Sequence, residues 1–132
     1  MKLIIGGYAQ GKLQYVLRQC DPAGCLVWNG EELPVHLNGL LQEGKETLIL
    51  NHLHGWIRKC LLAGGNPEEE IRMFLMKYPD VIIISDEIGN GIVPVDSFDR
   101  EYRERTGRIL VGLAGQAEEV ERVICRIGQK IK

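Results

Sequence analysis

The sequence predicts a three-layer α/β fold with a mainly parallel sheet, and three observations lead to this prediction. Short apolar runs alternate with segments of helical periodicity along the whole chain. The runs are continuously apolar, which is typical of strands that are covered by helices on both faces. The chain has 132 residues, of which 45% are hydrophobic and 26% charged, and one domain takes ~100–200 residues. We therefore expect residues 1–132 to form a single domain.

Five apolar runs predict the strands of the sheet. Turn-forming Gly, Pro, Asn and Asp residues mark several of their boundaries. The run at 2–5, closed by two glycines, predicts a buried central strand, and the run at 81–84, with the sequence VIII, is the strongest strand candidate. The predicted strands cover residues 2–5, 24–28, 47–51, 81–84 and 120–125.

The segments between these runs predict helices, because their apolar residues recur with the spacing of one helix face. Pro67 is typical of a first helical turn, and Asp96 or Ser97 can cap the longest segment. Gly64 and Gly65 end the segment that contains Trp56. The predicted helices cover residues 11–20, 33–41, 56–63, 67–78 and 97–117.

Composition and charge exclude several classes of protein. The net charge is −2 with acidic and basic residues interleaved, so we expect no nucleic-acid partner. No apolar stretch approaches the ~20 residues of a membrane span, and no secretory signal is visible, so we expect a cytoplasmic protein. The four cysteines lack the spacing of a zinc site and are interpreted as isolated thiols.

Residues 6–13 form the sharpest local motif, which we call the phosphate loop. Its sequence GGYAQGKL fits the pattern G-x-x-x-x-G-K between a predicted strand and a predicted helix. Backbone N–H groups of such a loop surround a phosphate, and Lys12 can reach the outer phosphates. An ordinary Gly-rich turn with a surface lysine is the alternative. The predicted nucleotide-binding residues are Gly6, Gly7, Tyr8, Ala9, Gln10, Gly11, Lys12 and Leu13.

A second polar segment, residues 85–94, follows the most apolar strand. Ligands bind outside the carboxyl ends of the strands in open α/β sheets, so Asp86 and Glu87 are candidates for holding a metal or a hydroxylated ligand. A solvated loop is the alternative. His52 and His54 follow the third strand, but they do not share a helix face and no third ligand is apparent, so no metal ligands are predicted.

These motifs resemble those of the bifunctional adenosylcobinamide kinase / adenosylcobinamide-phosphate guanylyltransferase family. The resemblance rests on IGGYAQGK at 5–12, DEIGNGIVP at 86–94, R-x-x-R-x-x-x-G-R at 100–108 and IGQKIK at 127–132. It implies a P-loop fold of the recombinase type and phosphorylation of a cobinamide hydroxyl by ATP or GTP. It also implies GMP transfer through a guanylylated histidine, and a homo-oligomer, which we expect to be a trimer.

The resemblance also implies roles for individual residues. Lys12 and Glu87 are the expected catalytic residues. The nucleotide and a corrinoid are the expected small-molecule partners, with substrate-binding positions at Glu87, Gly89, Gly91, Pro94, Arg100, Arg103 and Arg108. Without the resemblance, the arginines are expected to form a solvated, ion-paired helix face.

Three departures from the family pattern leave a second hypothesis open. Leu13 stands where the family has Ser, and Asn51 stands where it usually has an acidic residue, so both expected Mg²⁺ ligands are lost. The family's segment with the guanylylated histidine, which follows the second strand, has no counterpart in this sequence, and the surroundings of His36 do not match it. The alternative to an enzyme is therefore a catalytically impaired paralogue that binds nucleotide or corrinoid as a regulatory or assembly module.

Overall fold

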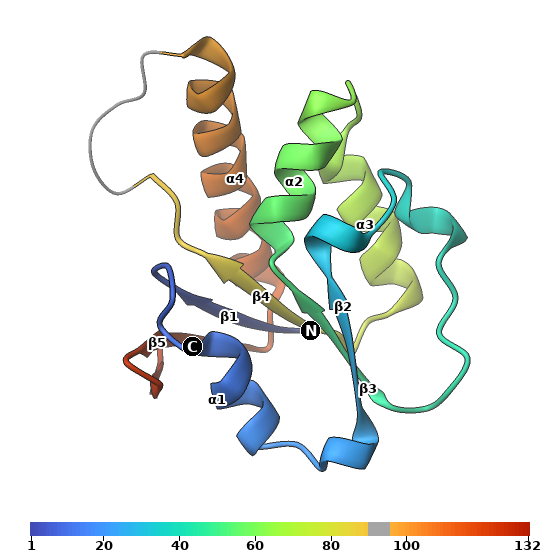
Figure 1. Ribbon diagram of the computed structural model, residues 1–132, viewed down its shortest axis with the longest axis vertical. Helices are drawn as coiled ribbons and strands as arrows, with labels where there is room; N and C mark the ends of the chain where they lie inside the picture. The colour runs from blue at the N-terminus through green and yellow to red at the C-terminus, as the bar shows by residue number, and fades with distance from the viewer. Residues whose placement is uncertain (90–95) are drawn as a thin grey trace.

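The computed structural model describes residues 1–89 and 96–132, which form a mainly parallel sheet with helices on both faces (Figure 1). The strand order is β2-β3-β4-β1-β5-β6, and the first five strands are parallel while β6 runs antiparallel to β5. The fold-class prediction is therefore confirmed. The strands are β1 Lys2–Gly6, β2 Cys25–Asn29, β3 Thr47–Asn51, β4 Ile82–Asp86, β5 Glu119–Ile124 and β6 Ile127–Lys130.

The helices divide unequally between the two faces of the sheet. The larger buried cluster packs the sheet against three helices, with Trp56, Phe74 and Leu113 among its members. The smaller cluster packs Ile4 and neighbouring strand residues against Val16 of the remaining helix. The helices are α1 Lys12–Arg18 on the second face, and α2 Leu53–Leu62, α3 Pro67–Lys77 and α4 Ser97–Gln116 on the first.

The start of α4 confirms one detail of the sequence analysis. The side chain of Asp96 accepts hydrogen bonds from the backbone N–H groups of Phe98 and Asp99, so Asp96 is the N-cap. Such a side chain satisfies N–H groups that have no partner within the helix. In residues 1–89 and 96–132, no helix combines the length and the apolar character needed to cross a membrane.

The predicted helix at 33–41 is wrong. The segment contains only one short 3₁₀ turn, η3 Leu37–Gly39, and is preceded by a second, η2 Gly30–Glu32. Leu33 and Leu37 are buried, as their spacing suggested, but Leu41 is exposed. Pro34 removes a backbone donor inside the segment, and its carbonyl accepts a hydrogen bond from the Trp56 indole, 2.9 Å away.

The C-terminal end of the sheet also differs from the prediction. The last predicted strand ended at Cys125, but β5 ends at Ile124, and Cys125 and Arg126 form the turn into β6. Both turn residues have positive φ, 49° and 64°, which is the backbone of a tight hairpin turn. The sequence analysis missed β6 because this strand lies at the sheet edge and is mostly exposed, so it carries no buried apolar run.

Strand order decides which loops meet at the carboxyl edge of the sheet. β1 is paired with both β4 and β5, and Gly6 at the end of β1 lies opposite Asp86 at the end of β4. β3 is the other neighbour of β4, so the segment after Asn51 reaches the same edge. The phosphate loop, the segment after β4 and the start of α2 are therefore neighbours.

Candidate functional site

The phosphate loop connects β1 to α1, as predicted. Ala9 and Gly11 have positive φ values of 54° and 81°, so the backbone reverses sharply before the helix. Lys12, the first residue of α1, folds back so that Nζ donates to the carbonyl oxygen of Gly7 at 2.7 Å. Tyr8 at the tip of the loop is exposed. The ammonium group of Lys12 thus lies against the loop rather than in solvent.

Lys12 is buried and paired with a carboxylate from β4. Its side chain is 5% exposed, and Nζ lies 2.5 Å from Oδ1 of Asp86. A buried ammonium group needs such a partner, because burial without one carries a large desolvation cost. Asp86 was named in the sequence analysis, but Glu87 was assigned the catalytic role. The structure brings Asp86, not Glu87, to Lys12.

Glu87 lies beside the phosphate loop but faces another cation. Its backbone N–H donates to the carbonyl oxygen of Gly6 at 2.8 Å, which fixes the chain as it leaves β4. Its carboxylate oxygen Oε2 accepts from Nη2 of Arg122 on β5 at 3.0 Å. Arg122 was not singled out from the sequence, since its position next to Glu87 depends on the strand order.

His54 extends this set of contacts toward β3. The backbone N–H of Asp86 donates to Nδ1 of His54 at 3.0 Å, and Nε2 lies 3.5 Å from Oδ2 of Asp86. Burial lowers the pKa of His54 below its usual 6.5, although the Asp86 carboxylate acts in the opposite direction. Tyr102 of α4 donates to the carbonyl oxygen of His54 at 3.1 Å, and burial raises the pKa of this tyrosine to about 12.

Leu13 and Asn51, the two residues that stand where metal ligands were expected, make contacts of a different kind. Leu13 packs against the smaller core cluster and supplies no oxygen. Asn51 is buried, and its amide donates to Oδ1 of Asn29 at 2.9 Å, which ties the ends of β3 and β2 together. Two carboxylates, those of Asp86 and Glu87, lie beside the phosphate loop, and Asp86 is the one in contact with Lys12. Mg²⁺ is commonly held by one or two carboxylates together with phosphate oxygens, so Asp86 fits this ion.

A hollow of about 550 Å³ brings four of the predicted substrate-binding residues together. Arg103 donates to the carbonyl oxygen of Gly89, which joins α4 to the segment after β4. Gly91 and Pro94, which were also predicted to bind substrate, lie outside the described residues. The hollow is lined by Ile88, Gly89, Arg100, Arg103, Glu104, Gly107, Arg108 and Val111.

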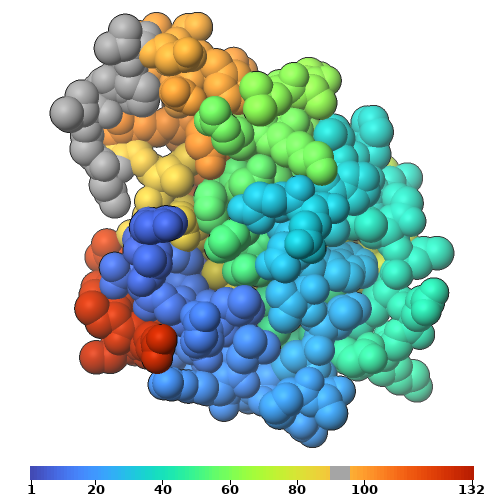
Figure 2. Space-filling model, viewed as in Figure 1, coloured from blue at the N-terminus to red at the C-terminus, as the bar shows by residue number. Residues whose placement is uncertain are grey.

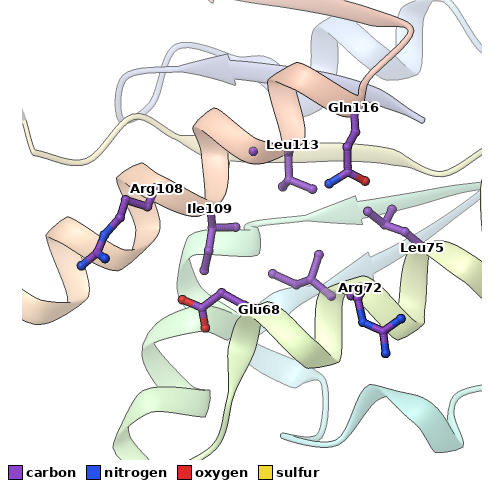
Figure 3. A pocket seen from close by; sticks show the side chains of 9 residues that line it. Glu68, Arg72, Leu75, Arg108, Ile109, Leu113 and Gln116 are labelled. Atoms are coloured by element: carbon purple, nitrogen blue, oxygen red, sulfur yellow. The ribbon is translucent and has the colours of Figure 1, made fainter.

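A second hollow, of about 340 Å³, lies between α3 and α4 (Figure 3). Leu75, Ile109 and Leu113 point into it. Arg108 stands at its rim and is paired with Glu104 at 2.8 Å, as expected for a solvated helix face. Apart from Arg108, none of the residues predicted for the site lines this hollow.

The hairpin turn between β5 and β6 packs against the phosphate loop and forms hydrogen bonds with Gln10. The backbone N–H of Arg126 donates to the carbonyl oxygen of Gln10, and that of Cys125 donates to the Gln10 side chain, both at 2.8 Å. Figure 2 shows the N-terminal segment in blue and the C-terminal segment in red next to each other on this face. A side chain at Gly11 would overlap Arg126, so glycine is needed there for close packing as well as for its φ.

His36 lies apart from these contacts. It precedes η3, is exposed, and its Nδ1 lies 3.1 Å from Oε2 of Glu70 on α3. Glu70 also accepts from the backbone N–H of Leu37 at 2.9 Å.

Comparison with known proteins identifies the family. The sequence profile of the family described as cobinamide kinase / cobinamide phosphate guanyltransferase matches residues 26–131. The chain is 42% identical over 52 residues to the bifunctional adenosylcobalamin biosynthesis proteins CobU of Salmonella typhimurium and Escherichia coli. The aligned stretch covers 39% of this chain but only 29% of each relative. Because the profile matches most of its length, the chain belongs to the cobinamide kinase / cobinamide phosphate guanyltransferase family.

Proposed function

We propose that this protein transfers a phosphoryl group from ATP or GTP to a hydroxyl group of cobinamide, with residues 1–132 acting as one nucleotide-binding domain. The observation that carries the proposal is the buried Lys12–Asp86 pair between the phosphate loop and the end of β4. Phosphoryl transfer needs mainly positioned cations and charge stabilisation, and this arrangement can supply both. The family assignment supports the choice of acceptor.

Lys12 and Asp86 have complementary roles in this proposal. The N–H groups of residues 6–13 and the ammonium group of Lys12 bind the phosphates, so Lys12 exchanges a carboxylate partner for a phosphate one. Asp86 is then released to hold Mg²⁺ together with phosphate oxygens. The ion, when bound, neutralises charge on the phosphates. Leu13 contributes no ligand, so Asp86 carries this role without a neighbouring hydroxyl group.

The acceptor is proposed to bind in the hollow lined by Gly89 and the arginines of α4. Three arginines line this hollow together with one acidic residue, Glu104, which is paired with Arg108. The net positive charge suits the negative charges that gather during transfer. Glu87, which precedes Gly89 in the segment after β4, forms an ion pair with Arg122. Gly91 and Pro94 belong to the proposed site by family resemblance alone.

A second transfer, of GMP through a histidine, has less support from this chain. The histidine in roughly the expected stretch, His36, is paired with Glu70 on α3. Because this sequence has no counterpart of the family's guanylylated-histidine segment, we expect no acid-labile GMP adduct after incubation with GTP and Mg²⁺. A stoichiometric adduct in the mass spectrum would contradict this, and His36→Asn would then test its position.

The kinase proposal is tested by incubating the purified protein with cobinamide and γ-labelled ATP or GTP and measuring labelled cobinamide phosphate. Lys12→Ala should abolish product and lower nucleotide affinity ~10–100-fold, since a charge-assisted hydrogen bond contributes ~1.5–3 kcal/mol. The matched control is Lys77→Ala, which removes a lysine that donates to the carbonyl oxygen of Leu40 at 2.5 Å. Nucleotide binding that is unaffected by Lys12→Ala would refute the proposal.

We also propose that the protein assembles as a homo-oligomer, as the family resemblance suggests, and specifically as a trimer. Light scattering at micromolar concentration gives the mass directly. A monomer mass would refute this part of the proposal without affecting the assignment of the phosphate loop.

A further inference from the structure

Three potential metal ligands meet at the carboxyl edge of β2 and β3, beside the phosphate loop but outside it. Glu31 lies in η2 just after β2, while His52 and His54 lie at the start of α2 just after β3. One ligand atom from each residue lies within 4.8 Å of the others. The sequence spacing revealed only the two histidines, because Glu31 arrives from a different strand.

The backbone around these residues is closely packed. Asn29 and Asn51, the last residues of the paired strands β2 and β3, are joined by a side-chain hydrogen bond of 2.9 Å. A Cβ at Gly30 would overlap the carbonyl oxygen of His52, and a Cβ at Gly55 would overlap the carboxylate of Glu31. Gly30 is therefore needed for the close approach of the two backbones, whereas a side chain at Gly55 would displace the flexible carboxylate of Glu31.

His52 and Glu31 already contact each other. Nδ1 of His52 lies 2.9 Å from Oε1 of Glu31. A carboxylate only accepts hydrogen bonds, so Nδ1 carries the proton in this contact. An ion that binds between the two groups takes the place of that proton, with Nδ1 and a carboxylate oxygen as its ligands. His52 also adopts a left-handed backbone conformation, with φ 57°, that turns the chain from β3 into α2.

His54 has to give up its contacts with Asp86 to act as a ligand. Its Nδ1 accepts the backbone N–H of Asp86 at 3.0 Å, and its Nε2 lies 3.5 Å from Oδ2 of the same residue. A rotation of the ring releases both nitrogens, and the loss of these contacts is small beside the coordination bonds of a transition metal. The ring centroids of His52 and His54 are 5.1 Å apart, so the two imidazoles remain neighbours.

We propose that Glu31, His52 and His54 form a binding site for a divalent transition-metal ion, of which zinc is the best match. Two histidines and one glutamate are a known ligand set for zinc with an open fourth position. The side chains of Glu31 and His52 are 53% and 46% exposed, so an ion can enter and a water or substrate oxygen can complete its shell. Mg²⁺ prefers an all-oxygen shell, so this site is distinct from the one proposed at Asp86.

The proposed metal site is coupled to the phosphate loop through one residue. The backbone N–H of Asp86 donates to His54, and its carboxylate oxygen Oδ1 forms an ion pair with Lys12. Metal binding therefore changes the partners of the Asp86 N–H. We expect the Asp86 amide signal to be among those that shift most in an NMR titration with Zn²⁺, because this group loses its acceptor.

The test is calorimetric titration of the metal-free protein with Zn²⁺, in the absence of nucleotide and corrinoid. One ion per chain should bind, and Glu31→Gln, His52→Asn and His54→Gln should each weaken binding by at least ~10–100-fold, the effect of losing an outer-shell partner. The matched control is His36→Asn, which removes a histidine with a similar carboxylate partner, Glu70, at 3.1 Å. An equal loss in this control, or unchanged affinity in the three variants, would overturn the proposal.

Two further measurements distinguish metal binding at this site from metal binding by cysteines and from an effect of unfolding. Cobalt bound by nitrogen and oxygen lacks the intense near-ultraviolet charge-transfer band of a thiolate ligand, so that band would overturn the proposal. Gly55→Ala leaves all three ligands in place but pushes against the Glu31 carboxylate. It should weaken Zn²⁺ binding without lowering the melting temperature measured in the absence of added metal, because alanine favours a helix more than glycine does. Unweakened binding would count against Glu31 as a ligand. None of these readouts depends on kinase activity.

Discussion

At the residue scale, the pairing of Lys12 with Asp86 leads to opposite effects of one substitution with and without Mg²⁺. In EDTA the Asp86 carboxylate competes with the phosphate for Lys12 and also repels the phosphate. Asp86→Asn should therefore tighten nucleotide binding by ~3–10-fold, about 0.7–1.4 kcal/mol. With Mg²⁺ present the same substitution removes the proposed ligand, so the enhancement by Mg²⁺ should disappear. Calorimetry under both conditions measures the two effects.

The control for this prediction is Asp80→Asn, which removes one negative charge from an exposed position before β4 begins at Ile82. It should change affinity little under either condition. Weaker binding of Asp86→Asn in EDTA would contradict the competition between carboxylate and phosphate. An undiminished Mg²⁺ enhancement in Asp86→Asn would instead point to Glu87 as the carboxylate that holds the ion.

Two glycines with similar backbone conformations allow the role of close packing in the phosphate loop to be isolated. Gly11 and Gly64 have φ values of 81° and 75°, and a Cβ at Gly64 meets nothing within 4 Å, whereas one at Gly11 overlaps Arg126. Gly64→Ala should lower the free energy of unfolding by about 1–2 kcal/mol, the cost of a left-handed conformation. Gly11→Ala should cost more, and it alone should weaken nucleotide binding. Equal effects on urea unfolding would contradict this difference.

The residues of the site were predictable to the extent that they lie in one local motif. The Gly-rich loop and Lys12 can be read from their order between a strand and a helix, and the structure places them there. The contact between Lys12 and Asp86 could not be predicted, since it requires β1 to pair with β4. The same limit applies to Glu31, which meets His52 only because β2 pairs with β3.

At the element scale, α3 and α4 are joined by an ion pair whose contribution depends on pH. Arg105 of α4 donates to both carboxylate oxygens of Glu68 of α3, at 3.1 and 2.6 Å, and these hydrogen bonds lower the pKa of Glu68 below its usual 4.5. A depressed carboxyl pKa stabilises the fold above the unfolded-state pKa and loses this effect as the pH falls through the folded-state value. Glu68 is about half exposed, so solvent screening keeps the effect small.

Arg105→Met should therefore lower the free energy of unfolding at pH 7 by ~0.2–1 kcal/mol, the range of exposed pairs. The difference from wild type should shrink as the pH falls from about 4.5 through the lower folded-state pKa, below which Glu68 is protonated in both states. Urea unfolding at pH 7 and at low pH measures it. Arg72→Met is the control, because Arg72 pairs with Glu69 within α3 and joins no second helix. A difference that persists at low pH would show that packing, rather than charge, is responsible.

Elements were predicted well wherever local sequence and burial agreed. The four runs that became β1 to β4 are buried or half-buried and lie within a residue or two of their predicted bounds. The leucines at 33 and 37 are buried but do not form a helix, because burial against α2 and α3 does not require helical backbone. β6 was missed because an exposed edge strand is stabilised by backbone pairing, which leaves little trace in hydropathy.

At the scale of the whole molecule, the unequal covering of the sheet predicts which part opens first. Among the residues that the structure describes, seventeen buried ones hold the face of α2, α3 and α4, whereas five hold the face of α1. Regions with less buried apolar surface open at lower free energy. We therefore expect the backbone amides of α1 to exchange with solvent through a partial opening that leaves α2 and α3 intact.

Nucleotide should selectively slow this exchange. Lys12 is both the first residue of α1 and the proposed phosphate ligand, so an opening that unfolds α1 also destroys the binding site. A ligand at 100 times its dissociation constant then raises the free energy of that opening by ~2.7 kcal/mol, about a 100-fold slower exchange. Amides of α3 that exchange by fluctuations leaving the loop folded should change little. Hydrogen exchange with and without nucleotide measures this, with Lys12→Ala at the same nucleotide concentration as control. If nucleotide slowed exchange in α3 and α4 but not in α1, the phosphate loop would not be the binding site.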